Sequence, residues 1–204
     1  EAVPLLLVVA KDQNSKGRVQ AIVGLGELGG VEVSLLIEVL KDKDVEVKAQ
    51  AVASLGDLGD RELSPLFLEL LNDQHSKVQA QAIVALGKIK EVQAIPLLIP
   101  VANGPFVLEV VEALGEIGGE QSVEFLIAAL EDQRSVVRGR AVVALGKVKD
   151  PRALPALIDL LEDKQLQGTV FWALQEITGA VVPAYKEQWK EWWELNKAQY
   201  AGAQ

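Results

Sequence analysis

The segment AVVALGK at residues 141–147 decides the fold, because five other segments of the chain are imperfect copies of it. When the copies are aligned, the equivalent positions are Gly26, Gly56, Gly87, Gly115, Gly146 and, in a degenerate last copy, Gln175. Successive copies therefore lie 28 to 31 residues apart. A period in this range indicates a stacked repeat protein.

Each copy has the apolar spacing of one helix face. Ala21, Ile22, Leu25 and Leu28 stand at i, i+1, i+4 and i+7, which places them on one side of an α-helix. A second apolar segment lies between consecutive copies, as in PRALPALIDLL at residues 151–161. Each repeat is therefore expected to consist of two antiparallel helices, with a glycine of positive φ ending the helix that carries the motif.

The end of the chain has a different composition. Trp189, Trp192 and Trp193 stand at i, i+3 and i+4 and share one face of a predicted last helix. A terminal repeat has no neighbour to cover its apolar side, so a solenoid needs an atypical end. We expect residues 1–180 to form the repeats and residues 181–204 to form a capping helix on the last of them; an aromatic ligand cage is the alternative interpretation of the three indoles.

The motif V-[RK]-x-x-A-x-x-A-L-G-x-[LIV] resembles the HEAT-like repeats of the phycobilisome-lyase type. VKAQAVASLGDLGD at 47–60 and the segment 136–163 carry it most fully. The Val-basic pair is present at Val47-Lys48 and Val137-Arg138, whereas Phe106-Val107 departs from it at both positions. The resemblance implies an all-α, armadillo-like fold, a right-handed α-solenoid of about six two-helix repeats with a C-terminal capping helix, and a role as a binding scaffold.

Composition argues against several functions. The formal charge of −9 and the scattered Lys and Arg residues disfavour nucleic acid, which is bound by clustered basic residues. Cysteine is absent and His75 is the one histidine, so thiolate metal sites, cysteine nucleophiles and His-rich metal sites have no ligands. We find no catalytic constellation, and we expect no enzyme activity, no metal and no cofactor.

The location of the protein stays open. No apolar run approaches the roughly 18 residues of a membrane span. The opening VPLLLVVA could end a signal peptide, but its residues match the repeat helix at 153–163 place for place. A chain that starts at Glu1 and lacks methionine is expected to be processed or truncated. It would be a soluble protein, cytoplasmic or exported after removal of an upstream segment.

The opposite face of each motif helix is the candidate binding surface. In a solenoid such faces line up into one surface, which is usually concave. The central and flanking columns consist of Gln20, Val23, Gln50, Ala53, Gln81, Val84, Glu109, Glu112, Arg140, Val143 and Trp172. Crowding on a concave side would also select small residues, but glutamine amides can bind the backbone of an extended peptide.

These observations favour a non-enzymatic scaffold that binds another protein or a peptide on the concave face, alone or as a subunit of a larger complex. Two alternatives stay open. The chain could be a subunit of a bilin lyase or chaperone-like complex that handles a chromophore, with a pocket near Trp172 or at the irregular connection 103–105. It could also be a structural spacer in a larger assembly.

Overall fold

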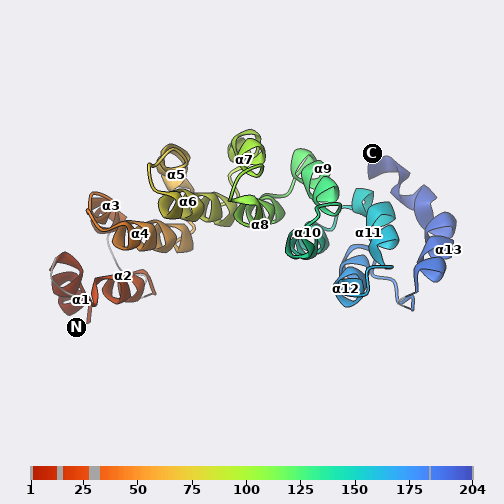
Figure 1. Ribbon diagram of the computed structural model, residues 1–204, viewed down its shortest axis with the longest axis horizontal. Helices are drawn as coiled ribbons and strands as arrows, with labels where there is room; N and C mark the ends of the chain where they lie inside the picture. The colour runs from red at the N-terminus through yellow and green to blue at the C-terminus, as the bar shows by residue number, and fades with distance from the viewer. Residues whose placement is uncertain (1, 13–15, 28–32, 184, 204) are drawn as a thin grey trace. The chain divides into compact units, whose positions relative to one another are not determined.

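The computed structural model describes residues 2–12, 16–27, 33–183 and 185–203. Within them the chain forms α-helices and short 3-10 helices and no strand, which confirms the expected all-α fold (Figure 1). Leu28, predicted to complete the apolar face of the first motif helix, lies outside the described residues. The contacts divide the chain into two compact units, residues 1–94 and 95–204.

The helices of the first unit are α1 (Ala2–Lys11), α2 (Arg18–Glu27), α3 (Val33–Val39), α4 (Val45–Asp57), α5 (Ser64–Leu70) and α6 (Ser76–Lys88), with 3-10 helices η1 (Arg61–Leu63) and η2 (Val92–Ala94). Those of the second unit are α7 (Ile95–Val101), α8 (Val107–Ile117), α9 (Glu120–Ala129), α10 (Ser135–Val148), α11 (Leu154–Leu160), α12 (Gln167–Thr178) and α13 (Lys186–Asn196), with η3 (Pro151–Ala153) and η4 (Lys197–Ala203).

The first unit is a stack of helix pairs. The motif helices α2, α4 and α6 lie side by side, and α1, α3 and α5 each pack on the partner that follows in the chain. The core consists of the apolar motif positions, such as Ile22, Leu25, Val52 and Leu55, which are fully buried. The two-helix repeat predicted from the 28–31-residue period is thereby confirmed.

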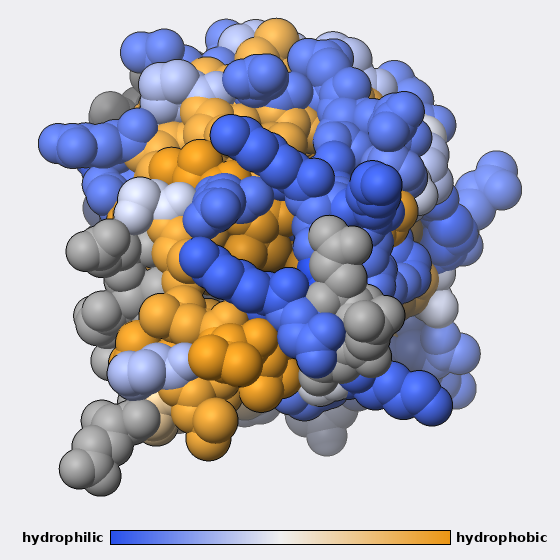
Figure 2. Space-filling model, turned by 90° about the vertical axis from the view of Figure 1, so that its left-hand side faces the viewer, coloured by the Kyte–Doolittle hydropathy of each residue, from blue (hydrophilic) through white to orange (hydrophobic). Residues whose placement is uncertain are grey.

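The outer side of α1 is the most apolar exposed surface of the first unit. Leu5 and Val8 are 68% and 67% exposed, and Figure 2 shows apolar surface at this end of the chain. At the place of Val8 the helices α3 and α5 carry Glu38 and Glu69. The first helix therefore lacks the charge that keeps its counterparts solvated.

The second unit repeats the arrangement and ends differently. Helices α8, α10 and α12 lie side by side, with α7, α9 and α11 in the second layer, and α13 packs on α11. Trp189 of α13 is fully buried and meets Phe171 of α12 edge-on, with ring centroids 6.5 Å apart. Lys186 ties the start of α13 to α11, because its Nζ lies 3.1 Å from carboxylate oxygens of Asp159 and Glu162.

The motif glycine allows neighbouring helices to approach closely. A β-carbon added at Gly56 would lie 2.8 Å from the Cβ of Ala85, and one at Gly115 would lie 2.6 Å from the Cβ of Ala144. Ala85 and Ala144 each stand two residues before the glycine of the next motif. The sequence A-L-G therefore supplies both sides of one contact: the alanine touches the preceding repeat and the glycine receives the following one.

The second glycine of the motif ends the helix, as expected from its position. Gly59 and Gly118 have φ values of 68° and 71°. At the same place the third and fifth motifs carry Lys90 and Lys149, which adopt φ values of 54° and 60°. A residue with a β-carbon is disfavoured in this left-handed conformation by about 1 kcal/mol or more.

Replacing Lys90 with glycine is expected to raise the free energy of unfolding by roughly 0.5 to 1 kcal/mol, since relief of the left-handed strain exceeds the entropy lost by a more flexible unfolded chain. Urea denaturation followed by circular dichroism measures the change. The reverse substitution, Gly59→Lys, should lower the stability by a similar amount. An unchanged midpoint for both variants would contradict the assigned backbone conformation.

Candidate partner-binding surface

The first candidate face is carried by α2, α4 and α6. It consists of Gln20, Val23, Gln50, Ala53, Gln81 and Val84, none of which is buried. The three helices are adjacent, so the structure brings these residues onto one three-helix surface. Gln50 and Gln81 line the same shallow depression of about 200 Å³, together with the side chains of Glu46 and Lys77.

The second candidate face is carried by α8, α10 and α12. It consists of Glu109, Glu112, Arg140, Val143 and Trp172, and all five side chains are at least partly exposed. Trp172 is 38% exposed. Its indole lies on the backbone of α10, because a β-carbon at Gly146 would be 2.6 Å from the ring. A rigid aromatic side chain thus stands beside Val143 at the open side of three helices.

Ion pairs connect neighbouring helices along both faces. Lys88 pairs with Asp57 and Lys77 with Glu46 in the first unit. In the second unit Lys147 Nζ lies 2.6 Å from Glu116 Oε1, and Arg140 Nη1 lies 3.0 Å from Glu112 Oε2. The sequence contained the signal for all of these pairs except Arg140–Glu112, because their opposite charges stand at equivalent positions of successive motifs. Exposed pairs of this kind add little stability, but they hold the basic side chains of the faces in place.

The depressions on the faces are shallow. The one beside Gln50 measures about 200 Å³, and the one between Glu112 and Lys147 about 40 Å³. Sites that enclose small molecules usually measure about 300 Å³ or more. The described surface of the two faces is therefore suited to an extended chain lying across the helices, with its side chains only partly enclosed.

Aspartates organise the turns that precede four of the motif helices. Oδ1 of each accepts the backbone N–H two residues later, at 2.8 to 2.9 Å; the donors are Asp44, His75, Arg134 and Gln165 for Asp42, Asp73, Asp132 and Asp163, respectively. This contact closes a side-chain turn. These aspartates have a second role, which uses the other carboxylate oxygen and which the repeat pattern does not reveal.

A basic side chain of the preceding repeat binds Oδ2 of three of these aspartates. Arg18 binds Asp42, Lys48 Nζ lies 3.1 Å from Asp73 Oδ2, and Arg138 Nη2 lies 2.8 Å from Asp163 Oδ2. The hydrogen bond from Arg138 lowers the pKa of Asp163. The basic position of the motif is therefore structural: it joins the start of one motif helix to the turn before the next.

Asp132 differs from the other three. The preceding motif carries Val107 at the basic position, and Asp132 is bound by Arg134 of its own turn, with Nε 2.9 Å from Oδ1 and Nη2 2.8 Å from Oδ2. Hydrogen bonds from Arg134 lower the pKa of Asp132 to about 2. Asp132 is therefore a carboxylate throughout the physiological pH range.

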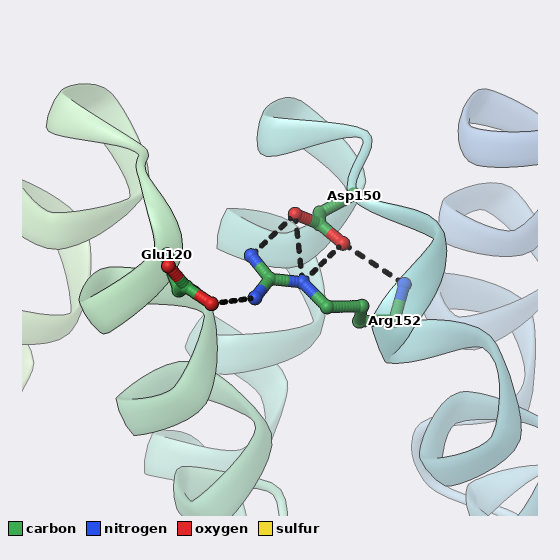
Figure 3. A network of polar contacts seen from close by, with 3 residues as sticks. All are labelled: Glu120, Asp150 and Arg152. Carbon is green, nitrogen blue, oxygen red and sulfur yellow. Dashed lines mark hydrogen bonds and ion pairs between the residues drawn. The ribbon is translucent and has the colours of Figure 1, made fainter. Parts of the chain in front are cut away.

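A further network joins α9 to η3. Arg152 donates Nε and Nη2 to Asp150, which also accepts the Arg152 backbone N–H at 2.9 Å, and Nη1 lies 3.1 Å from Glu120 Oε1 (Figure 3). The hydrogen bond from Arg152 lowers the pKa of Asp150. Each nitrogen group of this guanidinium has a partner within the chain. The network fixes a turn and offers no free group for chemistry.

No group of His, Asp and Glu residues in the described part of the chain could hold a metal ion. His75 caps α6, and its Nδ1 lies 3.0 Å from Asp73 Oδ1, so the imidazole belongs to the turn network. Across the described residues, none of the helices is long and apolar enough to cross a membrane.

The comparisons with known proteins agree with this architecture. The family model of HEAT repeats matches residues 33–107 and 104–178. No curated protein matches the chain significantly. Among solved structures, the CpcE–CpcF complex of phycocyanin lyase from Nostoc sp. PCC7120 is similar, with 24% identity, a TM-score of 0.65, and coverage of 86% of this chain and 76% of that one.

Two designed repeat proteins are also similar in fold. The designed armadillo repeat protein YIII(Dq)4CqI has 19% identity and a TM-score of 0.57, with coverage of 86% of this chain and 100% of its own. Computationally designed armadillo repeat proteins for modular peptide recognition have 20% identity and a TM-score of 0.54 at the same coverage. The two matches of the repeat model span most of the described helices, and the chain belongs to the HEAT repeat family.

Proposed function

We propose that the chain is a non-enzymatic scaffold that binds a partner protein or peptide on its two candidate faces. The observation that carries the proposal is the row of partly exposed Gln, Val and Ala side chains across α2, α4 and α6. Glutamine amides can donate to and accept from a peptide backbone, and valines between them offer apolar contact. A surface kept only for solubility would carry charge at these central positions.

The second face supplies the kind of residue that dominates binding energy. Trp172 is large, rigidly placed on Gly146 and 38% exposed, and tryptophan is over-represented among the residues that contribute most to interfaces. The fold supports the proposal as well, since designed armadillo repeat proteins of similar fold were made for modular peptide recognition. A nucleic-acid partner is disfavoured by the charge of −9.

Peptides selected from a displayed random library against the full chain test the proposal. Val84→Arg and Val143→Arg are expected to weaken the binding of the selected peptides at least tenfold, because each substitution removes a central contact. Glu69→Arg and Glu124→Arg introduce the same side chain at exposed positions of α5 and α9 and should leave affinity within about twofold. Equal losses in all four variants, or losses only in the control pair, would argue against the candidate faces.

The alternative function is that of a subunit that handles a chromophore, and the similarity in fold to phycocyanin lyase is what favours it. It called for an apolar pocket near Trp172 or beside residues 103–105. A cavity of about 360 Å³ does lie beside Asn103, but Glu131, Asp132 and Arg134 form part of its wall. A change in absorbance when a bilin is mixed with the chain would favour this alternative over the scaffold.

A further inference from the structure

The cavity beside Asn103 has an equivalent in the first repeat. It is lined by Ala102 and Asn103 of the turn before α8, by Val107 at the start of α8, by Phe125 of α9, and by Asp132 and Arg134 of the turn before α10, among others. The corresponding cavity between α1 and α3 measures about 370 Å³ and is lined by Ala10, Leu35, Val39 and Asp42, among others. In the repeat alignment Ala10 corresponds to Ala102 and Asp42 to Asp132.

The first repeat shows what this place in the fold binds. Nε of Arg18 donates to the carbonyl oxygen of Ala10 at 3.3 Å, and Nη2 pairs with Oδ2 of Asp42. The guanidinium thus joins two groups whose counterparts both line the cavity beside Asn103. Lys48 and Arg138 reach the equivalent aspartates in the same way. In three repeats, therefore, a cation of the same chain binds the aspartate at this place, and in the first repeat the cavity lies beside that cation.

The cavity beside Asn103 has no such cation, because the residue at the basic position is Val107, which is buried and forms part of the wall. Asp132 is held instead by Arg134 of its own turn, whose side chain is 55% exposed and also forms part of the cavity wall. Oδ2 of Asp132 accepts one hydrogen bond from Arg134. A carboxylate oxygen can accept a second hydrogen bond, and in the other three aspartates Oδ2 accepts from the preceding repeat.

We propose that this cavity is a docking site for an arginine side chain of a partner polypeptide. The guanidinium would take the place that Arg18 occupies in the first repeat, donating to Oδ2 of Asp132 and to the carbonyl of Ala102. Its methylene stem would lie against Val107 and Phe125, in the way that arginine stems cover apolar surface. The neighbouring Glu131 offsets the positive charge of Arg134. The site lies at the turns and does not rest on the function proposed for the two faces.

The test is a titration of the full chain, labelled with ¹⁵N, with the peptide acetyl-Gly-Arg-Gly-amide. Amide shifts are expected at the turns around Asn103 and Asp132, with a dissociation constant on the order of millimolar, as befits a single side chain. The isosteric citrulline peptide, which has no charge, should bind at least tenfold more weakly. Equal binding of both peptides, or shifts spread over the acidic surface, would refute the site.

Matched variants separate this site from general attraction to an acidic protein. Val107→Arg restores the residue that Arg18 and Arg138 represent in other repeats. Its guanidinium should bind Asp132 and the Ala102 carbonyl and so abolish the peptide shifts, whereas Val107→Leu should retain them. Asp132→Asn, which can keep the turn through its amide oxygen, should weaken binding at least tenfold even if Val107→Arg does not fold. Arg134→Gln removes the competing cation and should strengthen binding severalfold. Retained binding in Val107→Arg or Asp132→Asn, or its loss in Arg134→Gln, would overturn the proposal.

Discussion

Replacing Trp189 with alanine is expected to lower the free energy of unfolding by about 3 to 5 kcal/mol, the usual cost of deleting a buried aromatic side chain. Trp189 is fully buried at the end of the second unit. It touches Phe171 of α12 and Trp192 of its own helix, with ring centroids 6.5 and 5.5 Å apart. Removing the indole therefore leaves a void that the rigid neighbouring rings cannot fill.

Chemical denaturation followed by circular dichroism measures the loss, and Leu195→Ala on the same helix is its control. Leu195 is 85% exposed, so its truncation should change stability by no more than about 0.5 kcal/mol. Trp189→Phe should fall between the two. The indole Nε1 is buried without a hydrogen-bond acceptor in the described part of the protein, so phenylalanine sacrifices volume but no hydrogen bond. Similar midpoints for Trp189→Ala and Leu195→Ala would refute the buried role.

The same reasoning extends to residues 181–204 as a whole, whose role as a cap on the last repeat stays a prediction. Deleting residues 183–204 should lower the melting temperature and promote association through the bared side of α12 and α11. Repeats couple mainly to their neighbours, so the helicity of the first unit should largely survive. A thermal melting curve measures the loss of stability, and size-exclusion chromatography measures association. A truncated chain that stays monomeric and melts like the full chain would favour an exposed aromatic ligand site.

Replacing Gly115 with valine is expected to cost about 3 kcal/mol or more, at the upper end of the range for overpacked cores. A β-carbon at this position would lie 2.6 Å from the Cβ and 3.0 Å from the Cα of Ala144. The Cα belongs to the backbone of α10 and the Cβ is bonded directly to it, so neither atom can swing aside as the end of a long side chain could. The substitution must therefore push α8 and α10 apart along the line where they pack.

Gly168→Val provides the matched control for Gly115→Val, because both glycines lie in helices and gain the same side chain. Nothing lies within 4 Å of a β-carbon placed at Gly168. Since valine has a better helix propensity than glycine, this variant should be neutral or slightly more stable. Thermal unfolding of the two variants in parallel measures the loss of stability caused by the steric clash at Gly115. Equal melting temperatures would show that the helices do not meet there.

The fold was predictable because its signal is repeated. A single copy such as GLGELGG around Gly26 could be confused with a loop motif, but six aligned copies average out local deviations and reveal the period. The second role of the acidic turns was not predictable in the same way. Lys48 and Asp73 lie 25 residues apart in the chain, and their contact depends on how one repeat stacks on the next, which a pattern within one repeat does not specify.

The candidate faces were predictable only as positions on a helix. Helical spacing places Gln50 and Ala53 opposite the core, and the structure confirms that both are partly exposed. Helical spacing alone could not predict that Trp172 would lie over Gly146, because the position of the ring depends on the separation of two helices. A pocket at the connection 103–105 was predicted only for the chromophore alternative. The absence of a basic residue at Val107 could not be interpreted from the sequence, because its meaning depends on the contacts that Arg18, Lys48 and Arg138 make in the other repeats.

The aspartates of the turns bind their own turn through one oxygen and the preceding repeat through the other, and this has a consequence for how the chain opens. When a turn frays, the ion pair between its aspartate and the preceding motif helix breaks. When a motif helix shifts, the same ion pair to the next turn breaks. Local fluctuations are thereby converted into cooperative ones that involve two repeats at a time. At Asp132 both oxygens are held within one turn, so this turn has no such link to α8. A single valine, Val107, thus removes one of the links that couple successive repeats.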